Sequence, residues 1–179
     1  MVLLLLAIPS IAAQSIVGKV IKVADGDTVT ILDDRRLQHR VRLAGIDAPE
    51  KGQPSGKASR TRLGELVAGK EVRVEFDKYD RYGRIVGEVW VTPPDCPTCG
   101  KTLDAGLAQI TSGMAWWFRR YAHEQSEEDR GRCEFAEKEA RAKRAGLWQD
   151  KGAVPPWEYS VCLAGAIKNL TRKPQKGYL

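Results

Sequence analysis

Alternating and β-branched stretches along the chain predict five strands. The pattern is clearest from His39 to Ile46, where basic and apolar side chains alternate, as they do in a strand with one wet and one buried face. The other four strands are expected at Ile16 to Val23, Thr28 to Leu32, Glu71 to Phe76 and Ile85 to Val91. Polar turn residues separate the first two strands and again the last two, so each of these pairs is expected to form a hairpin.

Apolar residues at helical spacing predict three helices. They are expected from Ser55 to about Val67, from Leu103 to about Ile110, and from about Glu124 to Ala145. A glycine follows each of them, where helices commonly end, and Ser55 is suited to cap the first helix. Five strands in this order, with one helix between the third and the fourth, predict an α+β fold: a five-stranded Greek-key OB barrel with about three helices.

The two ends of the chain differ from the part between them. Residues 1–13 carry no charge and include a run of leucines followed by small residues, which is typical of a secretory signal peptide; a buried first strand is the alternative. Residues 14–150 form the predicted domain, and residues 151–179, with Pro155, Pro156 and a basic end, are expected to be an extended tail. Export would make the protein secreted or periplasmic, with no membrane segment after cleavage.

The four cysteines allow more than one interpretation. Cys96 and Cys99 form a Cys-Pro-Thr-Cys unit in a proline-rich loop, while Cys133 and Cys162 stand apart. In an oxidising compartment disulfides are expected, and we favour Cys96 with Cys99 and Cys133 with Cys162. A zinc site usually needs a second close pair of ligands, and a redox Cys-x-x-Cys usually lies in a βαβ unit, so both alternatives are weaker.

The composition is that expected of one soluble globular domain with a basic excess. The chain has 179 residues, and 29 Lys and Arg against 23 Asp and Glu give a formal net charge of +6. Charged residues make up 29% and apolar residues 42%, which excludes disordered, collagenous and multi-span membrane proteins. The basic excess favours a polyanionic partner without identifying one.

Charged residues and turn residues are concentrated in three short segments. The segments run from Asp25 to Val29, from Arg42 to Glu50 and from Asp80 to Arg84. Each alone is also typical of an ordinary turn or loop. Together, in this order and followed by the segment from Ala142 to Trp148, they resemble the staphylococcal (micrococcal) nuclease family, and the resemblance covers most of the chain after residue 15.

The carboxylates among these residues suit a cation-assisted hydrolysis. Such a reaction needs positive charge at the phosphate and a base beside the attacking water. Asp27 and Asp47 offer hard oxygen ligands of the kind Ca²⁺ prefers, and two carboxylates in one pocket repel each other unless a cation lies between them. The resemblance implies Ca²⁺ at Asp27, Asp47 and the backbone carbonyl of Ala48, with Glu50 as the general base.

Two arginines complete the predicted catalytic set. Arg42 and Arg84 carry planar guanidinium groups suited to bidentate phosphate contacts, and by resemblance they clamp the phosphate, with Arg84 near the leaving 5′ oxygen. In an unbroken strand Arg42 and Asp47, five residues apart, would face opposite sides. The chain is therefore expected to bend, either at Gly45 or at the end of the strand.

The resemblance also implies four substrate contacts. They are Arg81, Tyr82, Arg119 and Tyr121. Arg119 stands where the family has a second tyrosine, so stacking there would depend on a guanidinium group rather than a ring. The neighbouring Trp116, Trp117 and Phe118 are interpreted as core residues.

The predicted function is a secreted, Ca²⁺-dependent and monomeric nuclease without a stable protein partner. As the family does, it would cleave DNA, with RNA as a second candidate, show little sequence specificity and leave 3′-phosphate ends. The alternative is an OB-fold module that binds single strands without cutting them. Asp27, Asp47 and Glu50 favour hydrolysis, because carboxylates weaken the attraction of a polyanion and a binding module has no chemical need for them.

Overall fold

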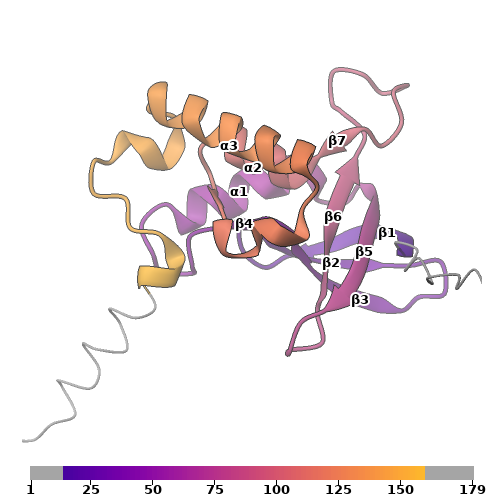
Figure 1. Ribbon diagram of the computed structural model, residues 1–179. Coiled ribbons are helices and arrows are strands. Elements are labelled where there is room, and N and C mark those ends of the chain that lie inside the picture. The colour runs from indigo at the N-terminus through magenta and orange to yellow at the C-terminus, as the bar shows by residue number, and fades with distance from the viewer. Residues whose placement is uncertain (1–13, 160–179) are drawn as a thin grey trace, which may run out of the picture.

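A closed barrel of five strands carries the rest of the structure (Figure 1). The computed structural model describes residues 14–159. Its barrel consists of β1 (Gln14–Val23), β2 (Thr28–Leu32), β3 (Gln38–Leu43), β5 (Glu71–Tyr79) and β6 (Ile85–Val91). Neighbours pair antiparallel in the order β3-β2-β1-β5-β6, and a parallel pairing of β3 with β6 closes the ring. The predicted α+β fold with an OB-type barrel is confirmed.

Aliphatic side chains fill the barrel. In β6 every second residue is buried, which is the period of a strand that turns one face to the core. Val29, Ile31, Val41, Val74 and Val89 are fully buried and come from four different strands. Burial of this apolar surface is the main force that holds the strands in register, because a slip of one residue would turn the buried set toward water.

Three α-helices lie together on one side of the barrel (Figure 1). They are α1 (Gly56–Val67), α2 (Ala105–Thr111) and α3 (Glu127–Ala142). Leu63 of α1, Ile110 of α2 and Ala136 of α3 are buried and belong to the same apolar core as the strands. The number and order of the predicted helices are therefore confirmed.

The predicted third strand is broken in two. β3 ends at Leu43, the turn residue Gly45 has φ +72°, and a short strand β4 (Ile46–Asp47) follows. β4 pairs with β8 (Trp116–Trp117), so that Asp47 lies opposite Trp116. Of the two expected places for the bend, the structure uses Gly45, whose missing Cβ makes a left-handed conformation accessible.

The helix ends differ in detail from the predictions. Ser55 has φ 65° and its side chain makes no capping hydrogen bond, so its predicted capping role is wrong. The second helix starts two residues late, because Leu103–Asp104 form β7 against β6 and Asp104 caps the helix by accepting from Gly106 N. The third starts at Glu127, where the side chain of Ser126 accepts from Asp129 N; two 3₁₀ helices flank it, η1 (Arg119–Glu124) and η2 (Gly146–Gln149).

Cys96 and Cys99 form the predicted disulfide in the loop after β6. Cys133 is a buried thiol without a disulfide partner in the described part of the chain, and Cys162 lies outside it, so the second pairing stays a prediction. The predicted signal peptide and residues 160–179 of the predicted tail also lie outside the described residues. Within residues 14–159 no helix has the length and apolar character needed to cross a membrane.

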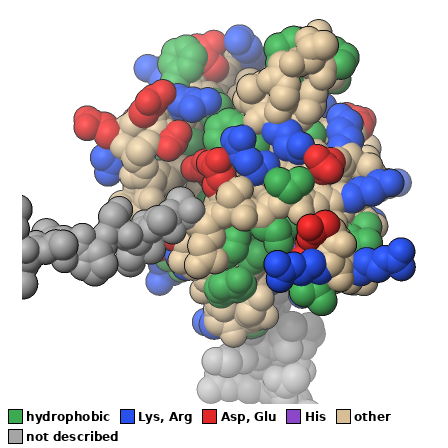
Figure 2. All heavy atoms as spheres, turned by 90° about the vertical axis from the view of Figure 1, so that its right-hand side faces the viewer, with side chains coloured by type: hydrophobic (Ala, Val, Ile, Leu, Met, Phe, Trp, Pro, Cys, Tyr) green, Lys and Arg blue, Asp and Glu red, His purple; other side chains and the backbone are tan. Residues whose placement is uncertain are grey.

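The basic excess does not form a uniform surface. On the face drawn in Figure 2, which is the right-hand side of Figure 1, Lys and Arg side chains are interspersed with Asp and Glu. Ion pairs account for part of this mixing, among them Lys101 with Glu71 at 2.7 Å and Arg73 with Glu75 at 3.0 Å. A site for a polyanion must therefore be found from local geometry rather than from net charge.

Candidate active site

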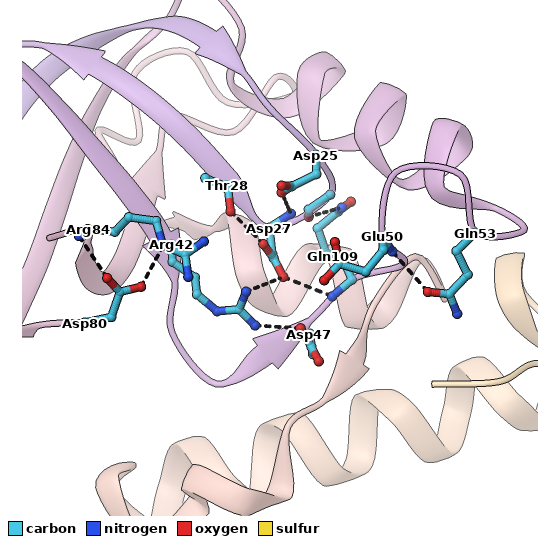
Figure 3. A network of polar contacts seen from close by, with 12 residues as sticks. Asp25, Asp27, Thr28, Arg42, Asp47, Glu50, Gln53, Asp80, Arg84 and Gln109 are labelled. Carbon is cyan, nitrogen blue, oxygen red and sulfur yellow. Dashed lines mark hydrogen bonds and ion pairs between the residues drawn. The ribbon is translucent and has the colours of Figure 1, made fainter. Parts of the chain in front are cut away.

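Asp27 is held rigidly at the turn between β1 and β2. Its carboxylate is only 4% exposed; Oδ1 accepts a hydrogen bond from Thr28 Oγ1 at 2.8 Å, and Oδ2 accepts one from the backbone N of Ala48 at 3.1 Å (Figure 3). Gly26 is required beside it, because a Cβ there would lie 1.9 Å from Ser59 Oγ and 2.7 Å from the Ala48 Cβ. The turn is further fixed by buried Gln109, whose Nε2 donates to the carbonyl of Gly26 at 2.8 Å.

Arg42 joins Asp27 to Asp47. Figure 3 shows the guanidinium group between the two carboxylates: Nη2 lies 2.5 Å from Asp47 Oδ1, and Nη1 lies 3.4 Å from Asp27 Oδ2. The bend at Gly45 makes this possible, because it returns Asp47 to the face of the sheet that Arg42 occupies. The two aspartates predicted as cation ligands and one of the two predicted phosphate clamps are thus in direct contact.

Burial dominates the electrostatics of this group. It raises the pKa of Asp27 and of Asp47, and although the positive charge of Arg42 opposes the rise, mutual repulsion of the carboxylates adds to it for Asp27. The pKa of Asp25 is raised to about 6, first by burial and then by the charge of Asp27. An additional positive charge beside these carboxylates would therefore stabilise their ionised forms.

Glu50 begins the loop that leads to α1. Its backbone N donates to Gln53 Oε1 at 3.1 Å, and the backbone N of Gln53 donates back to the Glu50 carbonyl at 2.9 Å (Figure 3). The Glu50 carboxylate itself is exposed and has no hydrogen bond or ion pair with the described residues, but its charge raises the pKa of Asp47. A rigid backbone with a free carboxylate suits a group that exchanges protons with water.

Arg84 lies at the base of the hairpin between β5 and β6. Its Nε is 2.6 Å from Asp80 Oδ2, and its backbone N donates to Asp80 Oδ1 at 3.0 Å. These contacts lower the pKa of Asp80 below its ordinary value, although burial acts in the other direction. Asp80 thereby orients Arg84, while the exposed ring of Tyr82 lies under the guanidinium groups of both Arg81 and Arg84, at 4.9 and 5.5 Å.

A cleft of about 480 Å³ brings most of the predicted residues together. It is lined by Arg42, Asp47, Glu50, Arg81, Tyr82 and Arg84. Asp27 does not line the cleft, but it contacts Arg42, which does. A second hollow of about 490 Å³ continues from the cleft and shares Arg42, Arg81, Tyr82 and Arg84 with it; the predicted substrate residue Tyr121 lines this second hollow.

Arg119 lies away from both hollows. Its Nη2 is 2.7 Å from Glu137 Oε2, and its guanidinium group is stacked over the Trp117 ring at 4.5 Å. Glu137 is 1% exposed and also faces Arg141 at 3.5 Å, so Arg119 neutralises a buried charge on α3. This position gives Arg119 a structural role, and its contact with substrate stays a prediction.

Sequence reasoning missed four residues of the cleft. They are Arg40, Phe118, Pro156 and Trp157. Arg40 could have been predicted from the sequence. It is a basic residue of the alternating strand, two positions before Arg42 and therefore on the same face. Phe118, interpreted as a core residue, in fact lines both hollows. Pro156 and Trp157 belong to the predicted tail, and no periodic signal connects them with the barrel.

The donor set of Asp27 and Asp47 fits a hard divalent cation. Both are buried carboxylates with raised pKa values, so the positive charge of Arg42 alone does not fully stabilise their ionised forms. Ca²⁺ takes oxygen ligands of this type. Among the described residues no three His, Cys, Asp or Glu side chains form a group that could hold a metal. A cation at Asp27 and Asp47 would therefore complete its shell with backbone and water oxygens, and the Ala48 backbone lies directly beside Asp27.

Comparison with known proteins agrees with this geometry. The family model described as staphylococcal nuclease homologue matches residues 40–150. A protein named micrococcal nuclease from Shigella flexneri is 42% identical over 144 residues, which cover 79% of each chain. An Escherichia coli protein named uncharacterized endonuclease is 37% identical over 157 residues, 88% of this chain and 92% of that one, and Protein ParB of Escherichia coli is 38% identical over 157 residues, 88% and 86% of the two chains.

The family match and the relatives named as nucleases define the class of protein: a nuclease-type hydrolase built on an OB-type barrel. The chain belongs to the staphylococcal nuclease family. The resemblance carried by the three charged segments is confirmed.

Proposed function

We propose that the protein is an exported, Ca²⁺-dependent nuclease that hydrolyses DNA, and RNA as well, with little base specificity and leaves 3′-phosphate ends. The observation that carries the proposal is a cleft that Glu50 shares with the Arg42 and Arg84 guanidinium groups and the buried Asp47, while the Glu50 carboxylate has no hydrogen bond or ion pair with the described residues. Phosphodiester hydrolysis needs this combination of positive charge for the phosphate and a base for the water.

Arg42 and Arg84 bind the phosphate in this proposal. Both carry planar guanidinium groups, and a phosphate offers them the same oxygen pair that a carboxylate does. Asp80 holds Arg84 in place before substrate arrives, so little side-chain entropy is lost when the phosphate binds. Cleavage that leaves a 3′-phosphate breaks the bond between phosphorus and the 5′ oxygen. Following the family resemblance, we assign Arg84 to this leaving oxygen.

Glu50 accepts the proton of the attacking water. Among the described residues its carboxylate makes no hydrogen bond or ion pair that would have to break first. The two hydrogen bonds between Glu50 and Gln53 limit the movement of the Glu50 backbone. A positioned general base typically contributes roughly 10²- to 10⁴-fold to the rate.

Asp27, Asp47 and the carbonyl of Ala48 are the residues that would hold Ca²⁺. When bound, the cation supplies positive charge to the phosphate oxygens and to the two carboxylates at once. Because Arg42 contacts both aspartates in the described structure, we expect its guanidinium group to exchange at least one of these contacts for the phosphate when cation and substrate are present.

The alternative function is an OB-fold module that binds single strands without hydrolysis. The cleft has an aromatic and cationic lining, as such modules do. The two buried aspartates favour hydrolysis instead, because burying carboxylates costs free energy that a binding site for a polyanion would avoid.

Cleavage assays on purified protein test the proposal. DNA and RNA are each incubated with Ca²⁺ or with a chelator, beside Glu50→Gln and the matched control Glu134→Gln, an exposed glutamate in the middle of α3. We expect Ca²⁺-dependent cutting that Glu50→Gln loses and Glu134→Gln keeps. Undiminished cutting in the chelator would contradict the cation assignment, and retardation of DNA without shortening would favour the binding module.

Export and a monomeric state are separate parts of the proposal. They rest on the uncharged, leucine-rich residues 1–13 and on the size of the domain. Mass spectrometry of protein recovered from the periplasm or medium should find a mature chain that starts near residue 14, and light scattering should give the mass of one chain. A chain retained in the cytoplasm with residues 1–13 intact would contradict export.

A further inference from the structure

The segment after η2 returns to the cleft. Residues 151–159 follow the part of the chain that matches the family model, and their composition alone predicted an extended tail. In the structure Pro156 and Trp157 line the same cleft as Arg42 and Glu50. The segment therefore adds a wall to the site that the barrel alone does not provide.

Trp157 presents an aromatic surface in this wall. Its ring is stacked on that of Phe118, with centroids 5.3 Å apart and an angle of 26° between the planes, and its edge meets Trp116 at 6.4 Å. Tyr121 in turn packs edge-on against Phe118 at 5.2 Å. Trp157 is nevertheless 39% exposed, so part of this large ring remains open to solvent beside the cleft. An exposed aromatic ring held by other rings is suited to stacking on a further planar group.

The segment is anchored at a functional loop. Buried Gln53 donates from Nε2 to the Val154 carbonyl at 2.5 Å, while its Oε1 accepts from the backbone N of Glu50. Tyr159 Oη contacts the Gly52 carbonyl at 3.5 Å. Pro155 and Pro156 restrict the backbone just before Trp157, which lowers the entropy lost when this residue is fixed. The position of Trp157 is thus defined by hydrogen bonds rather than by chain proximity alone.

The same cleft is rich in cationic groups. Arg40, Arg42, Arg81 and Arg84 all line it, and the guanidinium groups of the last two lie over the ring of Tyr82. A nucleotide has an anionic part and a planar part, and proteins that hold single strands bind the first with basic groups and stack aromatic side chains on the second. The lining of this cleft carries both chemistries.

We infer that Trp157, supported by Phe118, forms a stacking subsite for the base of a nucleotide next to the scissile phosphate. The C-terminal segment then acts in substrate positioning, with Trp157 as a binding residue and Gln53 as the positioning residue that connects it to the loop of Glu50. The inference rests on the proposed nuclease function of the same cleft and adds to it a recognition element from outside the matched family segment.

An oligonucleotide with one cleavable linkage tests this subsite. It is prepared with all bases and, separately, without the base on the 5′ or the 3′ side of that linkage. With all bases present, Trp157→Ala should raise KM about 5- to 150-fold, the range that loss of one base–aromatic stack produces, with little change in kcat. Trp157→Phe should retain most of the affinity, and Phe135→Ala, which removes an exposed ring from α3, should have no effect.

The abasic substrates separate stacking from a merely structural role. On one of them the unmodified protein and Trp157→Ala should have the same KM, because the partner of the ring is gone. An equal loss on all three substrates, a loss in kcat rather than KM, or no effect of Trp157→Ala would overturn the inference.

Binding of the same oligonucleotides in a chelator gives a readout that does not depend on cleavage. Fluorescence anisotropy should show weaker binding by Trp157→Ala to the complete strand and to the abasic strand that keeps the stacked base, and equal binding to the strand that lacks it. If the unmodified protein binds in this base-dependent way but never cuts with Ca²⁺, the nuclease proposal fails and the stacking subsite stands. If it cuts and Trp157→Ala binds like the unmodified protein, the subsite fails and the nuclease proposal stands.

Discussion

Arg42 Nη2 lies 2.5 Å from Asp47 Oδ1, across the bend that separates β3 from β4. The pair unites two functions that the reaction needs, because the guanidinium group suits a phosphate and the carboxylate suits a cation. Strand alternation alone would place them on opposite faces, and the left-handed turn at Gly45 removes that obstacle. The site therefore depends on one backbone conformation.

Gly45→Ala should disturb this relationship. The new side chain would have to adopt φ +72°, which costs about 1–2 kcal/mol, and its Cβ would lie 2.4 Å from Gln125 Nε2. We expect a lower melting temperature and reduced cleavage. Gly131→Ala is the control, because this helical glycine has no neighbour within 4 Å of a new Cβ and the change should stabilise α3 by up to about 1 kcal/mol. Equal effects of the two changes would argue against a special role for the bend.

Glu50→Gln should separate proton transfer from cation binding. The cleavage rate is expected to fall roughly 10²- to 10⁴-fold, because the amide cannot accept the proton of water. The rise in melting temperature on adding Ca²⁺ should persist, because Glu50 is not among the proposed ligands. Calorimetric melting with and without Ca²⁺, beside rate measurements, checks both parts. Loss of the Ca²⁺ effect would make Glu50 a ligand instead.

The pKa of Asp25, raised to about 6, predicts how the contribution of this residue to the stability of the cation-free protein changes with pH. Burial makes the ionised carboxylate unfavourable in the folded state, so the folded state takes up a proton more readily than the unfolded one. As pH falls from 7 through about 6 toward 4, the contribution of Asp25 to stability should increase. Asp33 and Asp80 have lowered pKa values, and their opposing effect appears only as pH falls below their ordinary value.

Asp25→Asn isolates this contribution. The amide oxygen can still accept the hydrogen bond from the backbone N of Asp27, so the turn should persist. Denaturant unfolding in a chelator should find the variant more stable than the unmodified protein at pH 7, with the difference shrinking as the pH is lowered. A difference that does not change between pH 7 and pH 4 would contradict the raised pKa.

Arg119→Ala should change stability rather than substrate affinity. Removing one partner of the buried Glu137 carboxylate should cost about 1–2 kcal/mol, a moderate value because Arg119 is half exposed and Arg141 remains nearby. KM should stay unchanged. Arg81→Ala makes the opposite comparison, since Arg81 lines the cleft and its loss should raise KM with little effect on melting. A raised KM in Arg119→Ala would restore the contact with substrate that the sequence predicted.

The barrel and the grouping of Arg42 with Asp27 and Asp47 could be predicted from the sequence. Strand periodicity is a local property of the sequence. It located the five barrel strands correctly, with small shifts at their ends. The bend between Arg42 and Asp47 could also be anticipated, because two residues of the same active site cannot lie on opposite faces of a strand. The choice of Gly45 for the bend required the structure, since it depends on the pairing of β4 with the distant strand β8.

Contacts between segments far apart in the sequence account for what was missed. Ser55 is the right residue type for a cap, but the close approach of Gly56 to the Glu50 carbonyl accompanies a left-handed backbone at Ser55. Trp157 was indistinguishable from a residue in an extended tail. Phe118, on which it stacks, and Gln53, which bonds Val154 of the same segment, are both far from it along the chain.

In the proposed mechanism a divalent cation binds between Asp27 and Asp47 and frees Arg42 for the phosphate. Crystals grown with Ca²⁺ and a nucleoside 3′,5′-diphosphate, measured at a wavelength that gives an anomalous signal for calcium, test it directly. We expect an anomalous peak within ligand distance of both carboxylates, with the Arg42 guanidinium group on a phosphate oxygen. A map in which Arg42 still joins the two aspartates, with calcium absent or bound elsewhere, would contradict this mechanism.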